Sequence, residues 1–134
     1  MACSICTKVA EVGDAALYRD AQWVAMPSGD KPGWVMLATR EHVEWTWAMS
    51  GAQAASFGPV VARISEKIRA ATDASKVYLV GLGEAAIHCH FLLIPRVEGL
   101  GDDIRASLRK WGEAVGDDEE ASRLAKVLRG ELAQ

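Results

Sequence analysis

The sequence lacks an apolar run long enough to cross a bilayer, and its first residues show no basic region followed by an apolar one. We therefore expect no membrane association and a cytoplasmic location. Only three cysteines occur among 134 residues, too few for a disulfide framework. In a reducing compartment, so small a number favours metal or thiol chemistry.

A basic stripe is also missing. Lysine and arginine number 15 against 18 aspartate and glutamate residues, which gives a net charge of −3. Binding of nucleic acid through its phosphates is therefore not expected. Repeats and low-complexity segments are absent too. Half of the residues are apolar and a quarter are charged, as in one soluble globular domain of ordinary size.

Five segments have the composition of β-strands, and a turn-rich loop at residues 27–33 separates the second from the third. Helical patterns follow the third strand and the fifth. This order predicts an α+β fold with a largely antiparallel sheet of about five strands, one long helix and C-terminal helices. The predicted strands span residues 15–19, 23–26, 34–39, 76–82 and 88–95.

The long helix begins after Ser50, which forms a capping-box pattern with Gln53. Gly58 and Pro59 interrupt it, so either the helix kinks there or its strong part begins at Pro59.

We expect a domain over residues 1–100 and a helical extension over 101–134 packed on it, with Asp117 or Asp118 starting the last helix. The apolar positions are Phe57, Val60, Val61, Ile64, Ile68 and Ala71 in the long helix, Ile104, Leu108, Trp111 and Val115 after the last strand, and Leu124, Ala125, Leu128 and Leu132 near the end.

The most informative segment runs from His88 to Arg96. If it is a strand, alternation puts His88, His90 and Leu92 on one face. Paired imidazoles on one face can bind a metal, or one of them can attack phosphorus. A plain strand with one histidine packed in the core is the simpler alternative. The opposite face, which we expect in the core, carries Cys89, Phe91 and Leu93.

In this segment and several others, the sequence resembles the histidine triad family of nucleotide hydrolases and transferases. The resemblance covers roughly residues 3–96, and it depends on the order and spacing of short motifs. It implies the family's α+β fold and a homodimer. The motifs are Cys3-x-x-Cys6, Pro32-Gly33-Trp34, the strand Val35-Met36-Leu37, Arg40-Glu41-His42, Val80-Gly81-Leu82-Gly83-Glu84, and His88-x-His90-x-Leu92-Leu93-Ile94-Pro95-Arg96.

The chain departs from the family pattern at two positions. Leu92 stands where the third histidine of the triad is expected, and Trp34 stands where the turn motif has a histidine. Glu84 adds a carboxylate near the place where the family often has an uncharged hydrogen-bond donor. Arg96 would supply compensating positive charge only by bending back toward the site.

The resemblance implies a structural zinc ion held by Cys3, Cys6, His42 and His88. Two thiolates and two imidazoles form a ligand set that tetrahedral zinc prefers, and a closed set of four leaves no open position for catalysis. A redox pair or two ordinary thiols remain alternatives for the cysteines. Cys89 faces away from the histidines and is expected to act as a small buried apolar residue.

By the same resemblance, His90 is the nucleophile. It would attack the α-phosphorus of a nucleotide or dinucleoside polyphosphate and form a nucleotidyl-histidine intermediate. Leu92 can neither donate a hydrogen bond nor move a proton, which predicts a slower enzyme. Two alternatives remain. One is a module that binds nucleotide without turnover, and the other is a zinc-stabilised interaction domain with no nucleotide site.

Four of the tryptophans, Trp23, Trp34, Trp45 and Trp47, crowd the first half of the chain. Their rings can stack on a base, although core packing or a dimer interface is the simpler interpretation. The acidic run at residues 117–120 is most simply a helix start.

Overall fold

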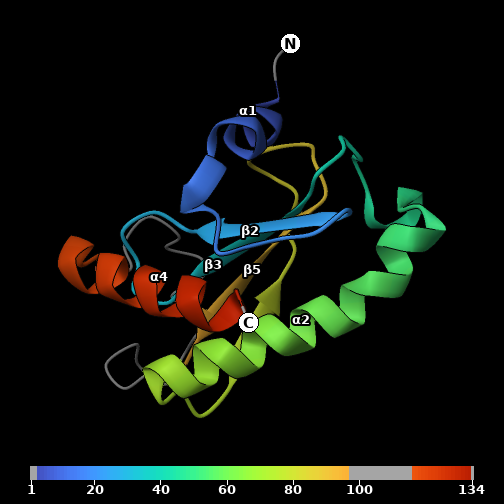
Figure 1. The fold of residues 1–134 in the computed structure, drawn as a ribbon. Helices are drawn as coiled ribbons and strands as arrows, with labels where there is room; N and C mark the ends of the chain where they lie inside the picture. Colours follow the sequence, from blue (N-terminus) through green and yellow to red (C-terminus); the bar gives the residue numbers. More distant parts are fainter. Residues whose placement is uncertain (1–2, 97–115, 134) are drawn as a thin grey trace.

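The predicted strands pair into one antiparallel sheet in the order β1-β2-β3-β5-β4. The computed structural model describes residues 3–96 and 116–133. The predicted α+β class is confirmed, and Figure 1 shows helices on both faces of the sheet. The strands are β1 (Tyr18–Arg19), β2 (Trp23–Pro27), β3 (Val35–Thr39), β4 (Val77–Val80) and β5 (His90–Pro95). The helices are α1 (Ser4–Glu11), α2 (Gly51–Thr72) and α4 (Asp118–Leu132), with 3-10 turns at Gly13–Ala15 and Thr46–Ala48.

Several strands are shorter than the sequence patterns predict. β1 begins at Tyr18 rather than Ala15, which ends a 3-10 turn at Gly13–Ala15. β5 begins at His90 rather than His88, because the Cys89 amide donates to the Val43 carbonyl, in the loop after β3, at 2.5 Å. The segment with Ile104, Leu108, Trp111 and Val115, predicted to be helical, lies outside the described residues.

The sheet buries a different apolar cluster on each face. The face that carries Trp23, Leu37 and Leu93 packs against Ile64 and Leu128 from α2 and α4. The opposite face packs against α1 through Ile5. That second cluster holds Ile5, Val24, Met26, Trp34, Met36, Ala38, Leu92 and Ile94. Two layers of helix thus enclose one sheet, and the histidine strand β5 lies beside β3, with core on both sides.

Helix α2 runs unbroken through Pro59, with the predicted capping box at its start. The Ser50 hydroxyl accepts from the Gln53 amide at 3.1 Å, and the Gln53 side chain accepts from the Ser50 amide at 2.8 Å. Pro59 removes the donor to the Ala55 carbonyl, but both residues lie on the exposed side, where water replaces the lost bond.

Gly33 fixes the turn that leads into β3. Its φ of +77° is in the left-handed region, and an added Cβ would lie 2.8 Å from Cγ2 of Thr72 at the end of α2. The turn therefore approaches α2 closely only because this position has no side chain.

The last helix closes the α2 side of the sheet. Asp117 caps α4 by accepting from the Glu120 amide at 3.1 Å, so the first of the two candidate start residues is the cap. Leu128 and Leu132 enter the same core cluster as α2. The described part of the C-terminal region thus packs on the sheet domain.

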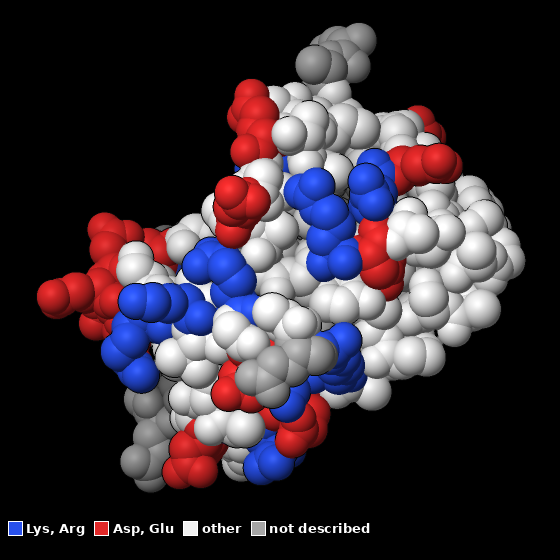
Figure 2. All heavy atoms as spheres, viewed as in Figure 1, with Lys and Arg blue, Asp and Glu red and all other residues white. Residues whose placement is uncertain are grey.

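Among the described residues, no helix combines the length and apolar character that crossing a bilayer requires. On the face in Figure 2, acidic and basic side chains are interspersed. That distribution agrees with the absence of a basic stripe in the sequence.

Truncating the α2 core should destabilise the fold strongly. Ile64 is fully buried between α2 and the sheet, so Ile64→Ala should lower the free energy of unfolding by about 2–5 kcal/mol. Val127→Ala, on the exposed side of α4, is the control and should change it by less than about 0.5 kcal/mol. Urea denaturation followed by circular dichroism measures both. Equal effects from the two variants would contradict this packing.

Candidate metal and catalytic site

Helix α1 places two thiols one turn apart. Cys3 is the N-cap of α1, and its Sγ accepts from the Cys6 amide at 3.4 Å. Ile5, only 4% exposed, anchors the helix to the sheet. Residues three apart share one helix face, so both Sγ atoms point the same way.

Two histidines from distant parts of the chain meet these thiols. Nδ1 of His88 lies 3.4 Å from Sγ of Cys3 and 3.5 Å from Sγ of Cys6. Nδ1 of His42, just beyond β3, lies 3.3 Å from Sγ of Cys6. The four ligand atoms all lie within 4.8 Å of one another. The structure thus brings together all four residues that the resemblance implies as ligands.

The spacing of these atoms fits a tetrahedral zinc ion. Zinc–sulfur bonds of about 2.3 Å and zinc–nitrogen bonds of about 2.0 Å at the tetrahedral angle put sulfur and nitrogen about 3.5 Å apart. The observed sulfur–nitrogen distances of 3.3–3.5 Å match that value. Donor set and geometry together support a structural zinc site, with every ligand position filled by the protein.

The remaining nitrogen of His88 is held by the end of β3. Nε2 lies 2.8 Å from the Thr39 carbonyl and 3.1 Å from the Thr39 hydroxyl, which itself donates to the Glu41 carbonyl. A carbonyl only accepts, so Nε2 carries the proton and Nδ1 presents its lone pair to the thiols. Such a partner fixes both the tautomer and the ring orientation of a metal-binding histidine.

His42 has an acidic partner on its far side. Its Nε2 lies 3.7 Å from Oε1 of Glu44, while its Nδ1 faces Cys6. The rings of His42 and His88 meet edge to face, with centroids 5.1 Å apart. At 3.7 Å the carboxylate makes no hydrogen bond to His42, whereas Nε2 of His88 is bonded to the Thr39 carbonyl at 2.8 Å.

The pKa shift of His88 favours metal binding, whereas the pKa shift of Cys6 opposes it. Burial lowers the pKa of His88, helped by the nearby His42 and His90, although the bond to the Thr39 carbonyl opposes it. His88 therefore stays neutral, as a ligand must. Burial, followed by the bond and charge of Cys3, raises the pKa of the Cys6 thiol. A bound cation reverses that shift, because a coordinated thiol is deprotonated.

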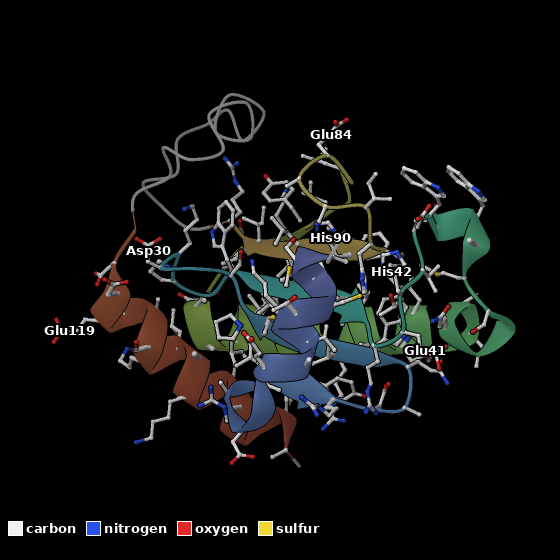
Figure 3. The ribbon with its side chains drawn as sticks, turned by 90° about the horizontal axis from the view of Figure 1, so that it is seen from above. Asp30, Glu41, His42, Glu84, His90 and Glu119 are labelled. Atoms are coloured by element: carbon white, nitrogen blue, oxygen red, sulfur yellow. The ribbon has the colours of Figure 1, made fainter. Side chains whose placement is uncertain are left out.

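His90 opens β5 and is bonded back to its own chain. Its Nδ1 lies 2.5 Å from the backbone carbonyl of His88. The carbonyl must accept, so Nδ1 carries the proton and Nε2 keeps its lone pair. Figure 3 shows His90 and His42 beside α1, with Glu84 on the loop before β5. His90 thus has the tautomer that a nucleophile needs, with a carbonyl that the sequence alone did not identify.

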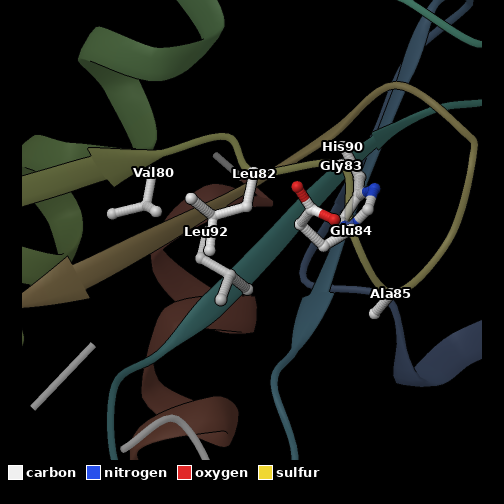
Figure 4. A pocket seen from close by; sticks show the side chains of 7 residues that line it. All are labelled: Val80, Leu82, Gly83, Glu84, Ala85, His90 and Leu92. Atoms are coloured by element: carbon white, nitrogen blue, oxygen red, sulfur yellow. The ribbon is translucent and has the colours of Figure 1, made fainter. Parts of the chain in front are cut away.

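His90 borders two pockets. The first, of about 230 Å³, is lined by apolar side chains, His90 and Glu84, as Figure 4 shows. The second, of about 260 Å³, lies toward the 3-10 turn at Thr46–Ala48. The first pocket is lined by Val80, Leu82, Gly83, Glu84, Ala85, His90 and Leu92. The shared boundary makes His90 accessible from both sides.

The departures from the triad pattern lie in or near the same site. Leu92 lines the first pocket and is 6% exposed, packed in the α1-side cluster that also contains Trp34 and Met36. Arg96 donates to the Tyr78 hydroxyl at 3.1 Å and lines neither pocket. No positive charge from Arg96 therefore compensates for Glu84.

Cys89 lies away from the metal cluster. It is 4% exposed and belongs to the core cluster on the α2 side of the sheet. Burial raises the pKa of its thiol, so it stays protonated. The strand alternation predicted for Cys89, Phe91 and Leu93 is confirmed, because all three lie in that cluster.

Three features of the site were missed by sequence reasoning. The helix that begins at Ser4 was not predicted, because its N-cap is Cys3, a residue type that gives no capping signal in a sequence. Thr39 was assigned only to a buried strand, yet it orients His88. Glu44, whose carboxylate lies near His42, was not considered either; its position two residues after His42 was the only signal in the sequence.

Comparisons with known proteins point to one fold. No family model matches the chain, and no curated protein matches it. A solved histidine triad nucleotide-binding protein from Sulfolobus tokodaii, described as hypothetical, is 21% identical, with a TM-score of 0.73 over 98% of this chain and 92% of that one. A zinc-bound histidine triad family protein from Mycobacterium smegmatis is 21% identical, with a TM-score of 0.72; the match covers 100% of this chain and 95% of that one. A Hit-like protein involved in cell-cycle regulation from Bartonella henselae is 18% identical, with a TM-score of 0.71; the match covers 97% of this chain and 96% of that one. The chain has the fold of these histidine triad structures.

The hydrogen bonds predict opposite tautomers for His88 and His90. His88 should carry its proton on Nε2 and His90 on Nδ1, because each of these nitrogens faces a backbone carbonyl. Long-range proton–nitrogen NMR at neutral pH distinguishes the two forms, and only three histidines need assignment. A His90 ring protonated on Nε2 alone would contradict the arrangement.

Proposed function

We propose that this protein is a zinc-containing nucleotide hydrolase or nucleotidyl transferase that acts at an α-phosphate through His90. The observation that carries the proposal is the 2.5 Å contact of His90 Nδ1 with the His88 carbonyl, which leaves Nε2 unprotonated beside two pockets. The solved proteins of the same fold include one described as nucleotide-binding, which supports a nucleotide ligand.

In the proposed reaction, His90 Nε2 attacks the α-phosphorus and forms a nucleotidyl-histidine, which water or an acceptor then resolves. The proton stays on Nδ1 throughout and is donated to the His88 carbonyl, which stabilises the positive charge that develops on the ring. The leaving group receives no proton from position 92, since Leu92 has none to give. General acid–base assistance is worth about 10²–10⁴-fold, so a slow enzyme is the expected form of this activity.

We further propose that Cys3, Cys6, His42 and His88 hold one zinc ion. The match of the sulfur–nitrogen distances to tetrahedral coordination supports this assignment. The ion would cross-link α1 to the segment after β3 and the segment before β5, and would supply no chemistry at phosphorus. Reduced cysteines are required as ligands, which supports a cytoplasmic location.

A homodimer is also proposed. Among the described strands, β4 pairs only with β5, and Leu79 on it is 45% exposed. A second copy of β4 would continue the sheet across a two-fold axis.

A binding module without turnover is the second candidate function. The burial of Leu92 in an apolar cluster and the carboxylate of Glu84 in the His90 pocket favour it. Nucleotide binding without product release would support this alternative. Failure to bind any nucleotide would point to a zinc-stabilised interaction domain.

Zinc content tests the metal assignment. We expect one zinc per chain in the protein as purified, and its loss in Cys3→Ser and Cys6→Ser, because three ligands no longer close the site. Cys89→Ser is the matched control and should keep its zinc, since that thiol lies in the core on the other face. Elemental analysis with a thermal melt before and after chelation measures the effect. Full zinc in Cys3→Ser would exclude the assignment.

Product release tests the catalytic assignment. The protein should release nucleoside monophosphate from at least one member of a panel of nucleoside phosphoramidates and dinucleoside polyphosphates, and His90→Ala should reduce release to background because the attacking nitrogen is gone. Quenching in alkaline denaturant, where the nitrogen–phosphorus bond survives, followed by mass spectrometry should find a nucleotidyl adduct on His90. Zinc content and circular dichroism of the variant establish that it folds. Undiminished release by folded His90→Ala would rule out this mechanism.

A further inference from the structure

Two of the four tryptophans singled out in the first half of the chain are exposed, and they stack on each other. Trp23 and Trp34 are buried, whereas Trp45 is 38% and Trp47 80% exposed. The rings of Trp45 and Trp47 lie 5.4 Å apart at 11°, in the turn between β3 and α2. An indole so exposed contributes little to the core, and its open face is a surface on which another planar ring can stack.

This tryptophan pair belongs to the second pocket beside His90. The pocket is lined on one side by Glu44, Trp45 and Trp47, and on the other by the chain at Gly81 to Gly83. His90, Leu82 and Gly83 border both pockets. Displacement at phosphorus sets the attacking and leaving atoms roughly in line, so the two parts of a substrate lie on different sides of the reacting atom. Two pockets that meet at His90 provide those two places.

The charges near His90 disfavour a polyphosphate. Each pocket contains a carboxylate, Glu84 in the first and Glu44 in the second. None of the lining residues, within the described part of the chain, is lysine or arginine. A leaving group with several phosphates would be repelled at short range with no nearby cation to offset it. The pocket of Trp45 and Trp47 therefore suits a leaving group without negative charge.

Leu92 restricts the leaving group in a second way. It donates no proton, so the leaving group must depart without one from this position. The pKa of a phenol is about 10, whereas the pKa of water or a simple alcohol is about 16. An aryloxide therefore departs far more readily without an acid than an alkoxide does.

We propose that the pocket of Trp45, Trp47 and Glu44 binds the aromatic leaving group of a nucleoside monophosphate aryl ester. The assignment rests on the proposed nucleotidyl chemistry and names its substrate class. The bond from His90 Nε2 to phosphorus forms as the bond from phosphorus to the aryl oxygen breaks. The aryloxide leaves with the electron pair and takes a proton from water. Water then attacks phosphorus, the electron pair of the nitrogen–phosphorus bond returns to Nε2, and the water's proton passes to solvent.

The turnover experiment compares the phenyl and methyl esters of one nucleoside monophosphate with zinc-loaded protein. The phenyl ester should be preferred in kcat/KM, and Trp47→Ala should reduce that preference about tenfold, mainly through KM, because stacking on the indole is lost. Trp47→Phe should restore part of it. Val127→Ala removes an exposed apolar side chain of α4 that lines neither pocket and should keep the full preference. An unchanged preference in Trp47→Ala would overturn the proposal.

A binding experiment separates this proposal from the catalytic one. Phenyl and methyl esters are titrated into His90→Ala protein by calorimetry, and the indole signals of Trp45 and Trp47 are followed by NMR. Tighter binding of the phenyl ester that depends on Trp47 supports the aromatic site even when the wild-type protein releases no product. Equal affinities, or indole signals that do not move, would overturn it. Self-association that Trp47→Ala abolishes and the phenyl ester does not alter would assign the tryptophan pair to a protein interface, and would also overturn it.

Discussion

His88 is the residue on which the rest of the site depends, because three of its atoms have separate partners. Nδ1 faces the two thiols of α1, Nε2 is bonded to the Thr39 carbonyl at the end of β3, and its own carbonyl accepts from His90. All three contacts can form together only if the ring and the backbone of His88 keep fixed positions. At 1% exposure, His88 has that fixed position without belonging to a strand.

This arrangement links the metal cluster to the candidate nucleophile through a single peptide unit. Any rotation of the His88 backbone that shifts Nδ1 away from the thiols also moves the carbonyl that orients His90. A metal ion bound by these side chains would hold the His88 backbone, and with it the carbonyl that faces His90, without touching His90 itself.

The fold was predictable to the extent that its periodicities were strong. Strand alternation identified the two faces of β5, and the capping box at Ser50 located the start of α2. The four residues of the metal cluster were identified through family resemblance, because nothing local connects Cys3 with His88 across 85 positions. The exposure of Trp45 and Trp47 was not predictable, because the sequence does not distinguish them from Trp23 and Trp34, which are buried in the structure. Strand ends were the weakest prediction, because single bonds such as that from the Cys89 amide decide them.

The order of the four cluster residues along the chain has a consequence for biosynthesis. Cys3 and Cys6 are made first, His42 follows, and His88 comes last. Chains are synthesised from the N-terminus at about 5–20 residues each second, so Cys3 and Cys6 are made several seconds before His88. During that interval α1 has neither the complete metal cluster nor the β5 residues of its sheet face to pack against. The four-residue cluster can therefore close only late in synthesis, once His88 has emerged.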